Sequence, residues 1–325
     1  LEDLHLVDLL PTLPESPNIT VPNFHYAASA WQQQELNWSQ AWQQATRPLA
    51  PLWALTNLLG EGSSYLLLLP MLLPLLGWRS SGRLLAALVV VNLLIQLAKL
   101  GLALPRPLHF DPALGLRPAS GFGIPSGHTA LAMLCWGLLL QLWLPGRSWL
   151  AWLGALLLTL LTGGARVYYG VHFVSDVAGG VLLGSVLLAL WPQANTQWEL
   201  WLLKPRVWWG LSLINGMAAL WLFEPSLLFG STLAGGLAWG LRSPLSREPV
   251  GAQGRLTAIA CCLLGPLLAM GLLAVLPQLL QDSKTLLVTQ ALLYLALGWW
   301  LTQGCWLAIA RLDKPQKIPA RKNQV

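Results

Sequence analysis

Two histidines and one aspartate have a spacing that suits nucleophilic chemistry. His172 and Asp176 are four residues apart, so on a helix they would share one face and could form a hydrogen bond. A carboxylate on one imidazole nitrogen sets the tautomer and leaves the other nitrogen as a nucleophile. His128 lies earlier in the chain and could deliver a proton to a leaving group. These three residues are the candidates for catalysis.

The residues just before His128 predict an anion site at the start of a helix. Ser126 is a natural N-cap, and Gly127 lets a ligand approach the backbone closely. The N–H groups of a first helical turn, together with the helix dipole, attract phosphate. The alternative is an ordinary capped helix start with His128 at the membrane interface.

Three cations near these segments could neutralise a phosphate. Pro105 and Pro107 end an apolar run and hold Arg106 in extended backbone, so that Arg106 can fold back toward Lys99. Arginine offers a planar fork to a phosphate and lysine a point charge. Arg166 is a third candidate. The alternatives are contact of the first two cations with lipid headgroups and a structural ion pair for Arg166.

The composition indicates what kind of chain positions these residues. Hydrophobic residues make up 55% and charged residues 10% of the 325 residues, whereas about 25% of a soluble domain is charged. The chain also has 19 tryptophans, which are favoured at bilayer interfaces. These values exclude a soluble fold, a disordered chain, a fibrous repeat and a disulfide scaffold. They indicate an all-α membrane protein.

The net charge of +6 and the four cysteines do not point to other functions. The basic residues lie between apolar runs rather than on one face, so no nucleic-acid partner is expected. The cysteines lie inside apolar runs without the spacing of a metal site or a disulfide framework. We therefore expect them to be small buried apolar residues.

Nine apolar stretches are candidates for membrane spans of about 20 residues each. They run near 57–78, 84–104, 126–144, 149–166, 171–192, 207–223, 225–241, 256–279 and 285–310. The polar residues before them predict an extramembrane segment with a short amphipathic helix around 28–45. The first residue, Leu1, is compatible with either a removed signal peptide or a shortened sequence.

The charges of the loops predict the orientation in the membrane. With nine spans the two ends of the chain lie on opposite sides, and thirteen of the 19 Lys and Arg residues fall on the side of the C-terminus. The positive-inside rule places that side in the cytoplasm and the N-terminus outside. Alternation of the spans then brings all the candidate residues above to the outer side. One common site is therefore expected there.

These motifs resemble those of the type 2 phosphatidic acid phosphatase (PAP2) superfamily, whose signature reads K-x6-RP, PSGH and SR-x5-H-x3-D. The matching residues are Lys99, Arg106, Pro107, Pro125, Ser126, Gly127, His128, Arg166, His172 and Asp176. The chain departs from the pattern at Ala165, where the family has Ser or Thr, which affects rate or substrate preference more than activity. The resemblance covers residues 50–195, with the usual six-helix core extending to about 223.

The resemblance implies a phosphatase that needs no metal or other cofactor. His172 would attack phosphorus and form a phosphohistidine, Asp176 would orient it, and His128 would protonate the leaving oxygen. The expected phosphate-binding residues are Lys99, Arg106, Ser126, Gly127 and Arg166. The sequence also has no Asp and Glu cluster suited to Mg²⁺.

A lipid phosphate or pyrophosphate at the outer membrane face is the favoured substrate. Undecaprenyl pyrophosphate, phosphatidylglycerol phosphate, phosphatidate and a sphingosine-phosphate-like lipid remain open. One alternative is the glucose-6-phosphatase branch of the superfamily, although its last motif residue is usually not aspartate. Others are a phosphotransferase and, in a different class, a transporter that only binds an anion or lipid.

Several expectations concern the rest of the chain. Glu61, Asp111 and Arg117 are possible headgroup contacts, and Gly235 and Gly236 suit close helix packing. The protein is expected in a bacterial inner (plasma) membrane, with its site on the extracytoplasmic side. Membrane lipids are its other expected partners, and its oligomeric state stays open. The expected division is an extracytoplasmic segment 1–50, a catalytic core 51–223, additional transmembrane helices 224–311 and a basic cytoplasmic tail 312–325.

Overall fold

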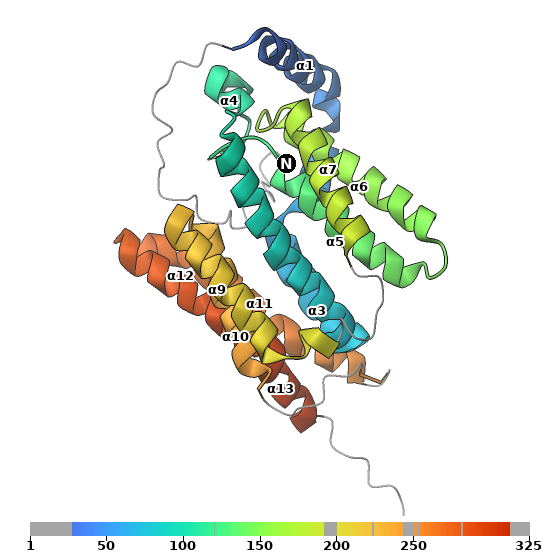
Figure 1. Ribbon diagram of the computed structural model, residues 1–325, viewed down its shortest axis with the longest axis vertical. Helices are drawn as coiled ribbons and strands as arrows, with labels where there is room; N and C mark the ends of the chain where they lie inside the picture. The colour runs from blue at the N-terminus through green and yellow to red at the C-terminus, as the bar shows by residue number, and fades with distance from the viewer. Residues whose placement is uncertain are drawn as a thin grey trace, which may run out of the picture.

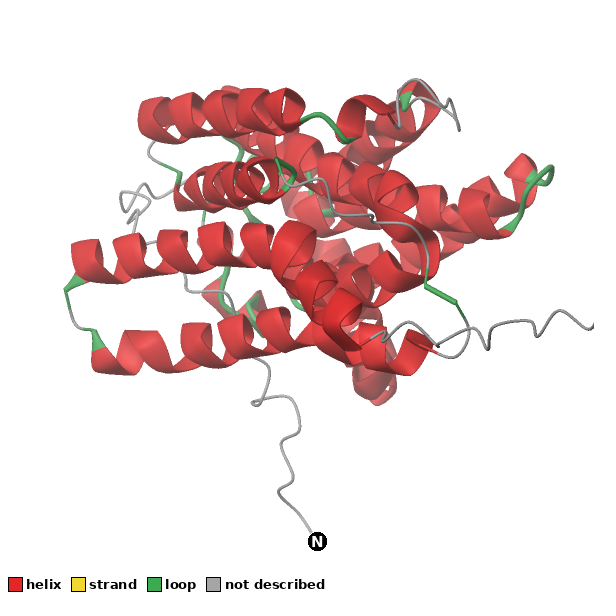
Figure 2. Ribbon diagram, turned by 90° about the horizontal axis from the view of Figure 1, so that it is seen from below, coloured by secondary structure: helices red, strands yellow, loops and turns green. Residues whose placement is uncertain are grey.

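The described part of the chain consists of helices and connecting loops, without a strand (Figure 2). The structure is a computed structural model, and it describes residues 28–119, 121–191, 200–222, 224–242, 250–251, 254–280 and 282–312. Within these ranges, the prediction of an all-α fold is confirmed. The basic tail and most of the polar N-terminal segment lie outside them.

The first described helix, α1 (Ala30–Thr46), confirms the helix expected around 28–45. Its start is well specified, because Ser29 and Gln32 form a reciprocal capping box. The short segments η1 (Arg47–Leu49), α2 (Ala50–Asn57) and η2 (Leu58–Gly60) follow. They lead the chain from α1 to the first long helix.

That long helix, α3 (Gly62–Leu102), doubles back on itself at Gly77. A straight helix of 41 residues would be about 62 Å long. Gly60 and Ile95 nevertheless both pack against the start of one later helix, at residues 127–128. Gly77 makes the reversal possible, since its φ of 71° suits glycine. The residues 79–83, expected as a loop between the first two spans, are helical instead.

Four further segments complete the part of the chain that carries the candidate site. They are α4 (Pro107–Phe110), α5 (Gly127–Trp143), α6 (Ser148–Tyr168) and α7 (Val174–Leu190), with η3 (Pro112–Leu114) after α4. Helices α5, α6 and α7 pack together on one side of α3 (Figure 1). Gly180 and Gly184 allow α7 to lie close to α5, because a Cβ atom there would meet Thr129 and Met133.

The C-terminal helices pack on the other side of α3 (Figure 1). They are α9 (Pro205–Leu222), α10 (Pro225–Gly240), α11 (Arg255–Leu279), α12 (Ser283–Trp299) and α13 (Cys305–Leu312), with the π-helical turn η5 (Trp300–Gly304) between the last two. The expected close packing is confirmed at Gly236, where a Cβ would lie 2.0 Å from the carbonyl oxygen of Leu295. Three cysteines are buried and Cys261 is partly exposed.

Four described helices are long and apolar enough to cross a membrane. They are Gly62–Phe110, Ser148–Tyr168, Arg255–Leu279 and Ser283–Arg311, the first of which contains both arms of α3. Helices α5 and α7 are apolar and have 17 residues each, a length of about 26 Å. These findings support a helical membrane protein. The count of nine spans and their orientation stay predictions.

Candidate active site

His172 and Asp176 lie together at the start of α7. Nδ1 of His172 is 3.2 Å from Oδ2 of Asp176, and each residue is 2% exposed. His172 is in the loop before the helix rather than in it, since Phe173 is the N-cap. The same carboxylate oxygen also accepts a hydrogen bond from the backbone N–H of Phe173. This bond holds the aspartate toward the loop, so that it reaches the imidazole.

Arg106 contacts the other imidazole nitrogen. Its Nη1 lies 3.0 Å from Nε2 of His172 and donates to the carbonyl of Val171, while its Nε donates to the carbonyl of Gly121. A guanidinium can only donate, so Nε2 must accept and Nδ1 must carry the proton toward Asp176. The unprotonated nitrogen therefore faces the cation.

The environment of His172 favours its neutral form. Burial lowers the pKa of His172 well below its usual value, and the positive charges of Arg106 and Arg166 lower it further. A neutral imidazole with its Nδ1 proton held by a carboxylate is the form that can act as a nucleophile.

A glycine-containing loop supports this pair from the side. Gly123 packs so closely against Asp176 that a Cβ atom would lie 2.6 Å from Oδ2. The N–H of Gly123 donates to the carbonyl of Leu104, and the N–H of Ser126 donates to the carbonyl of Asp176. The loop between α4 and α5 is thus attached both to the segment before Arg106 and to the first turn of α7.

Two polar atoms at this place are buried without a hydrogen-bond partner. They are Oγ of Ser126 and Nε of Arg166. Ser126 is the N-cap of α5 by position, but its hydroxyl does not cap the helix. A buried polar atom without a partner is costly. Both atoms belong to residues expected to bind phosphate.

The remaining predicted phosphate-binding residues lie around the same point. Gly127 begins α5 directly after Ser126, where N–H groups of a first turn lack helical partners. Lys99, near the end of α3, is within electrostatic range of Arg106, Arg166 and Asp176. The structure therefore brings the three predicted cations, the helix start and the His172–Asp176 pair together.

His128 lies at the edge of this group and is held by a carboxylate. Its Nε2 is 3.1 Å from Oε2 of Glu61. The same oxygen accepts from Nδ2 of Asn57 at 3.2 Å, and Oδ1 of Asn57 accepts from Nη1 of Arg166 at 2.8 Å. One chain of hydrogen bonds therefore joins His128 to Arg166. Sequence analysis did not identify Asn57, although its spacing of four from Glu61 is that of helical neighbours.

Glu35 is a second residue that sequence analysis did not identify. It lies on α1 and is 6% exposed. Its two carboxylate oxygens accept from the backbone N–H and the hydroxyl of Ser175, at 2.9 and 2.8 Å. Gln43 of the same helix donates to the carbonyl of Tyr168. Helix α1 is thereby attached to the segment that carries His172, and no local sequence signal indicates this contact.

The other two possible headgroup contacts have protein partners. Asp111 accepts from the N–H of Ala113 and from the side chain of Gln40. The guanidinium of Arg117 lies over the ring of Tyr169, 4.4 Å from its centre. Both residues help to hold the loop that follows Arg106. Contact of either with a lipid headgroup stays a prediction.

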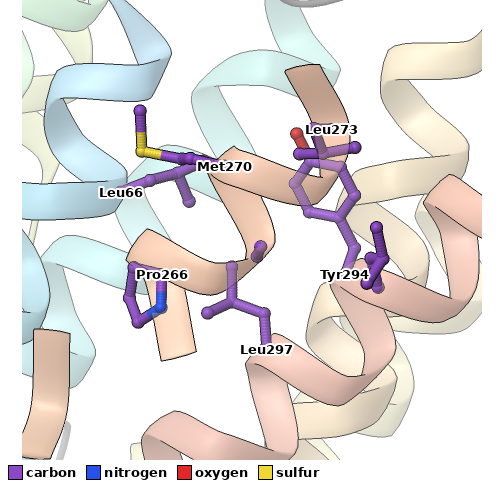
Figure 3. Close-up of a pocket in the computed structure, with 8 residues that line it drawn as sticks. Leu66, Pro266, Met270, Leu273, Tyr294 and Leu297 are labelled. Atoms are coloured by element: carbon purple, nitrogen blue, oxygen red, sulfur yellow. The ribbon is translucent and has the colours of Figure 1, made fainter. Parts of the chain in front are cut away.

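A small apolar pocket lies away from these residues. It is lined by side chains of α3, α11 and α12, among them Leu66, Met270 and Tyr294 (Figure 3). None of the predicted site residues lines it. The charged group around His172, rather than this pocket, has the side chains that chemistry requires.

Comparison with known proteins agrees with the motifs. Residues 81–199 match the model of the PAP2 superfamily. The matched range contains all the candidate catalytic and phosphate-binding residues, whereas Glu35, Asn57 and Glu61 lie before it. No curated protein and no solved structure matches the chain.

Proposed function

We propose that the chain, whose residues 81–199 match the model of the PAP2 superfamily, is an integral-membrane phosphatase that hydrolyses lipid phosphates or pyrophosphates. The observation that carries the proposal is the position of His172 between Asp176 and Arg106. An imidazole oriented by a carboxylate, with its free nitrogen beside cations, is suited to attack a phosphate.

In the proposed reaction, Nε2 of His172 attacks phosphorus while His128 gives a proton to the leaving oxygen. The bond between phosphorus and that oxygen breaks, and a phosphohistidine forms. A water molecule then attacks phosphorus and returns a proton to His128, which releases phosphate and restores neutral His172. Arg106 would shift its Nη1 hydrogen bond from the imidazole to a phosphate oxygen.

The cations would stabilise the negative charge of the phosphate, as metal ions do in many phosphatases. Phosphoryl transfer depends mainly on positioning and on stabilisation of charge on the phosphate oxygens. Lys99, Arg106 and Arg166 offer three basic side chains within electrostatic range of one another, and the unpartnered Ser126 hydroxyl offers a further donor. We therefore propose that the reaction needs no metal.

A lipid substrate is favoured by the surroundings of these residues. The cations lie at ends of apolar helices that are suited to a membrane, so a phosphate at the bilayer surface would reach them. The charges of the loops favour the extracytoplasmic face. Hydrolysis of a soluble sugar phosphate and transfer of the phosphoryl group to a second lipid use the same intermediate and are the alternatives.

Phosphate release from a panel of substrates tests the proposal. The protein is purified in detergent and assayed in the presence of a chelator. The substrates are phosphatidate, phosphatidylglycerol phosphate, undecaprenyl pyrophosphate and glucose 6-phosphate. We expect release from at least one lipid and little from the sugar phosphate. Preference for glucose 6-phosphate would favour the sugar phosphatase. Binding without release of phosphate from any substrate would favour a transporter or a lipid-binding protein.

A further inference from the structure

We propose that Glu61 is the positioning residue of the general acid, because its carboxylate holds Nε2 of His128 and turns Nδ1 toward the leaving oxygen. This inference rests on the proposed function and adds a second carboxylate–histidine pair to it. In the protonated ring, Nε2–H stays with Glu61 while the proton on Nδ1 passes to the leaving oxygen. Water returns that proton to Nδ1 in the second step.

The segment that carries Glu61 is held firmly against His128. A Cβ atom on Gly60 would lie 2.5 Å from the carbonyl oxygen of His128, so only glycine allows this approach. The carbonyl of Leu59 accepts from the indole N–H of Trp136 and from the hydroxyl of Tyr65. The carboxylate is therefore placed by rigid neighbours, as a positioning group requires.

The hydrogen-bond chain also links this carboxylate to the phosphate site. Asn57 donates to Oε2 of Glu61, the same oxygen that contacts His128, and accepts from Arg166. Rotation of Glu61 would break both contacts of this oxygen. Asn57 thus keeps the carboxylate turned toward the imidazole, while Arg166 keeps an unpartnered Nε for an anion.

The charges around His128 explain why it needs such a partner. Arg166, Lys99 and His172 all lie within electrostatic range of this ring. Glu61 contributes the opposing negative charge. Burial raises the pKa of Glu61, but contact with His128 and the charge of Arg166 lower it overall to about 2. The carboxylate is therefore ionised at neutral pH.

A direct headgroup contact is a weaker explanation of Glu61. A free carboxylate beside a phosphate would repel it, whereas a carboxylate bound to a proton donor favours proton transfer. The hydrogen bonds to His128 and Asn57 already occupy Oε2. The contact of Glu61 with His128 also resembles that of Asp176 with His172, in which a carboxylate contacts one imidazole nitrogen.

The test compares Glu61→Gln with wild-type protein on two substrates. Dodecyl phosphate has a poor leaving group and needs a general acid, whereas para-nitrophenyl phosphate does not. A general acid contributes about 10²–10⁴-fold, so Glu61→Gln should lose about 10-fold or more in kcat on dodecyl phosphate. On para-nitrophenyl phosphate the loss should be under about 3-fold, and KM should change little on either substrate.

The pH profile gives a readout that a purely structural role would not move. Without the carboxylate the protonated ring loses its ion partner, so the alkaline limb of kcat on dodecyl phosphate should move to lower pH. Glu61→Asp keeps the charge and should keep the limb in place. Asp282→Asn, which changes an exposed carboxylate at the start of α12, should change neither kcat nor the limb.

Two outcomes would overturn the inference. The first is an equal loss of kcat on both substrates in Glu61→Gln. The second is an unmoved alkaline limb in Glu61→Gln. Either result, with a thermal unfolding midpoint like that of wild type, would assign Glu61 another role. His128→Ala serves as the reference, since its loss should exceed that of Glu61→Gln on dodecyl phosphate. His172→Ala distinguishes failure of this inference from failure of the proposed function. If the proposed function is wrong, His172→Ala retains turnover, whatever the effect of Glu61→Gln.

Discussion

Nη1 of Arg106 lies 3.0 Å from Nε2 of His172, the nitrogen that Asp176 does not contact. Because arginine cannot accept a hydrogen bond, this contact assigns the tautomer of the imidazole. It also places a fixed positive charge where the phosphate of a substrate would lie. The arrangement joins the proposed nucleophile and a proposed charge-stabilising group in one contact.

Arg106→Lys should lose most of the activity although the charge remains. A lysine cannot reach the carbonyls of Gly121 and Val171 and Nε2 of His172 together, as the guanidinium does. We expect kcat/KM to fall by about 10²-fold or more. Arg255→Lys, an exposed exchange of the same kind, should leave the rate unchanged. An active Arg106→Lys would show that the fork geometry is unimportant.

Asp176→Asn should lower kcat by about 10²–10⁴-fold. An amide at this position can donate to Nδ1 of His172 and so stabilise the wrong tautomer. The loss should appear in kcat on both good and poor leaving groups, because it concerns the nucleophile rather than the acid. Steady-state kinetics on dodecyl phosphate and para-nitrophenyl phosphate measure it. A loss confined to the poor leaving group would contradict this role of Asp176.

Gly123→Ala should reduce activity through displacement of Asp176. The added methyl group would lie 2.6 Å from Oδ2, so the carboxylate or the loop must move. A shift of about 1 Å in a catalytic group can cost about 10²-fold. Gly271→Ala is a matched control, since a Cβ atom there would meet no neighbouring atom within 4 Å. Full activity in Gly123→Ala would show that the loop adjusts without moving Asp176.

Glu35→Ala should destabilise the attachment of α1. The buried carboxylate holds Ser175 by two hydrogen bonds, and hydrogen bonds to charged groups contribute about 1.5–3 kcal/mol each. We expect the free energy of unfolding to fall by about 3–6 kcal/mol, measured by denaturation in detergent. Gln34→Ala on the exposed face of α1 should change it by less than about 0.5 kcal/mol. Equal effects would contradict the importance of this contact.

The sequence predicted which charged residues lie near one another, because the residue types of a phosphate site are restricted by chemistry. Lys99, Arg106, Arg166 and the two histidines were expected at one face of the membrane, and the structure brings them together. The all-α fold and the family were also predicted, since apolar runs and the three motifs are local patterns. Such patterns can be recognised without knowledge of how the chain folds.

Contacts between distant segments could not be predicted in the same way. Glu35 and Ser175 are 140 residues apart, and Glu61 and His128 are 67 apart. Nothing near Glu35 or Glu61 in sequence identifies the partner, because helix packing decides which side chains meet. The sequence also predicted the reversal of α3 several residues after Gly77, where the chain turns in the structure. One glycine with a positive φ makes the turn there, without the polar loop that sequence analysis expects.

The most direct test of the proposed mechanism is phosphate release by His172→Ala. The protein is purified in detergent, its thermal unfolding is compared with that of wild type, and initial rates are measured on the best substrate of the panel. We expect a folded protein whose turnover is at least about 10³-fold lower, since His172 is the proposed nucleophile. Turnover within about 3-fold of wild type would contradict nucleophilic attack by His172.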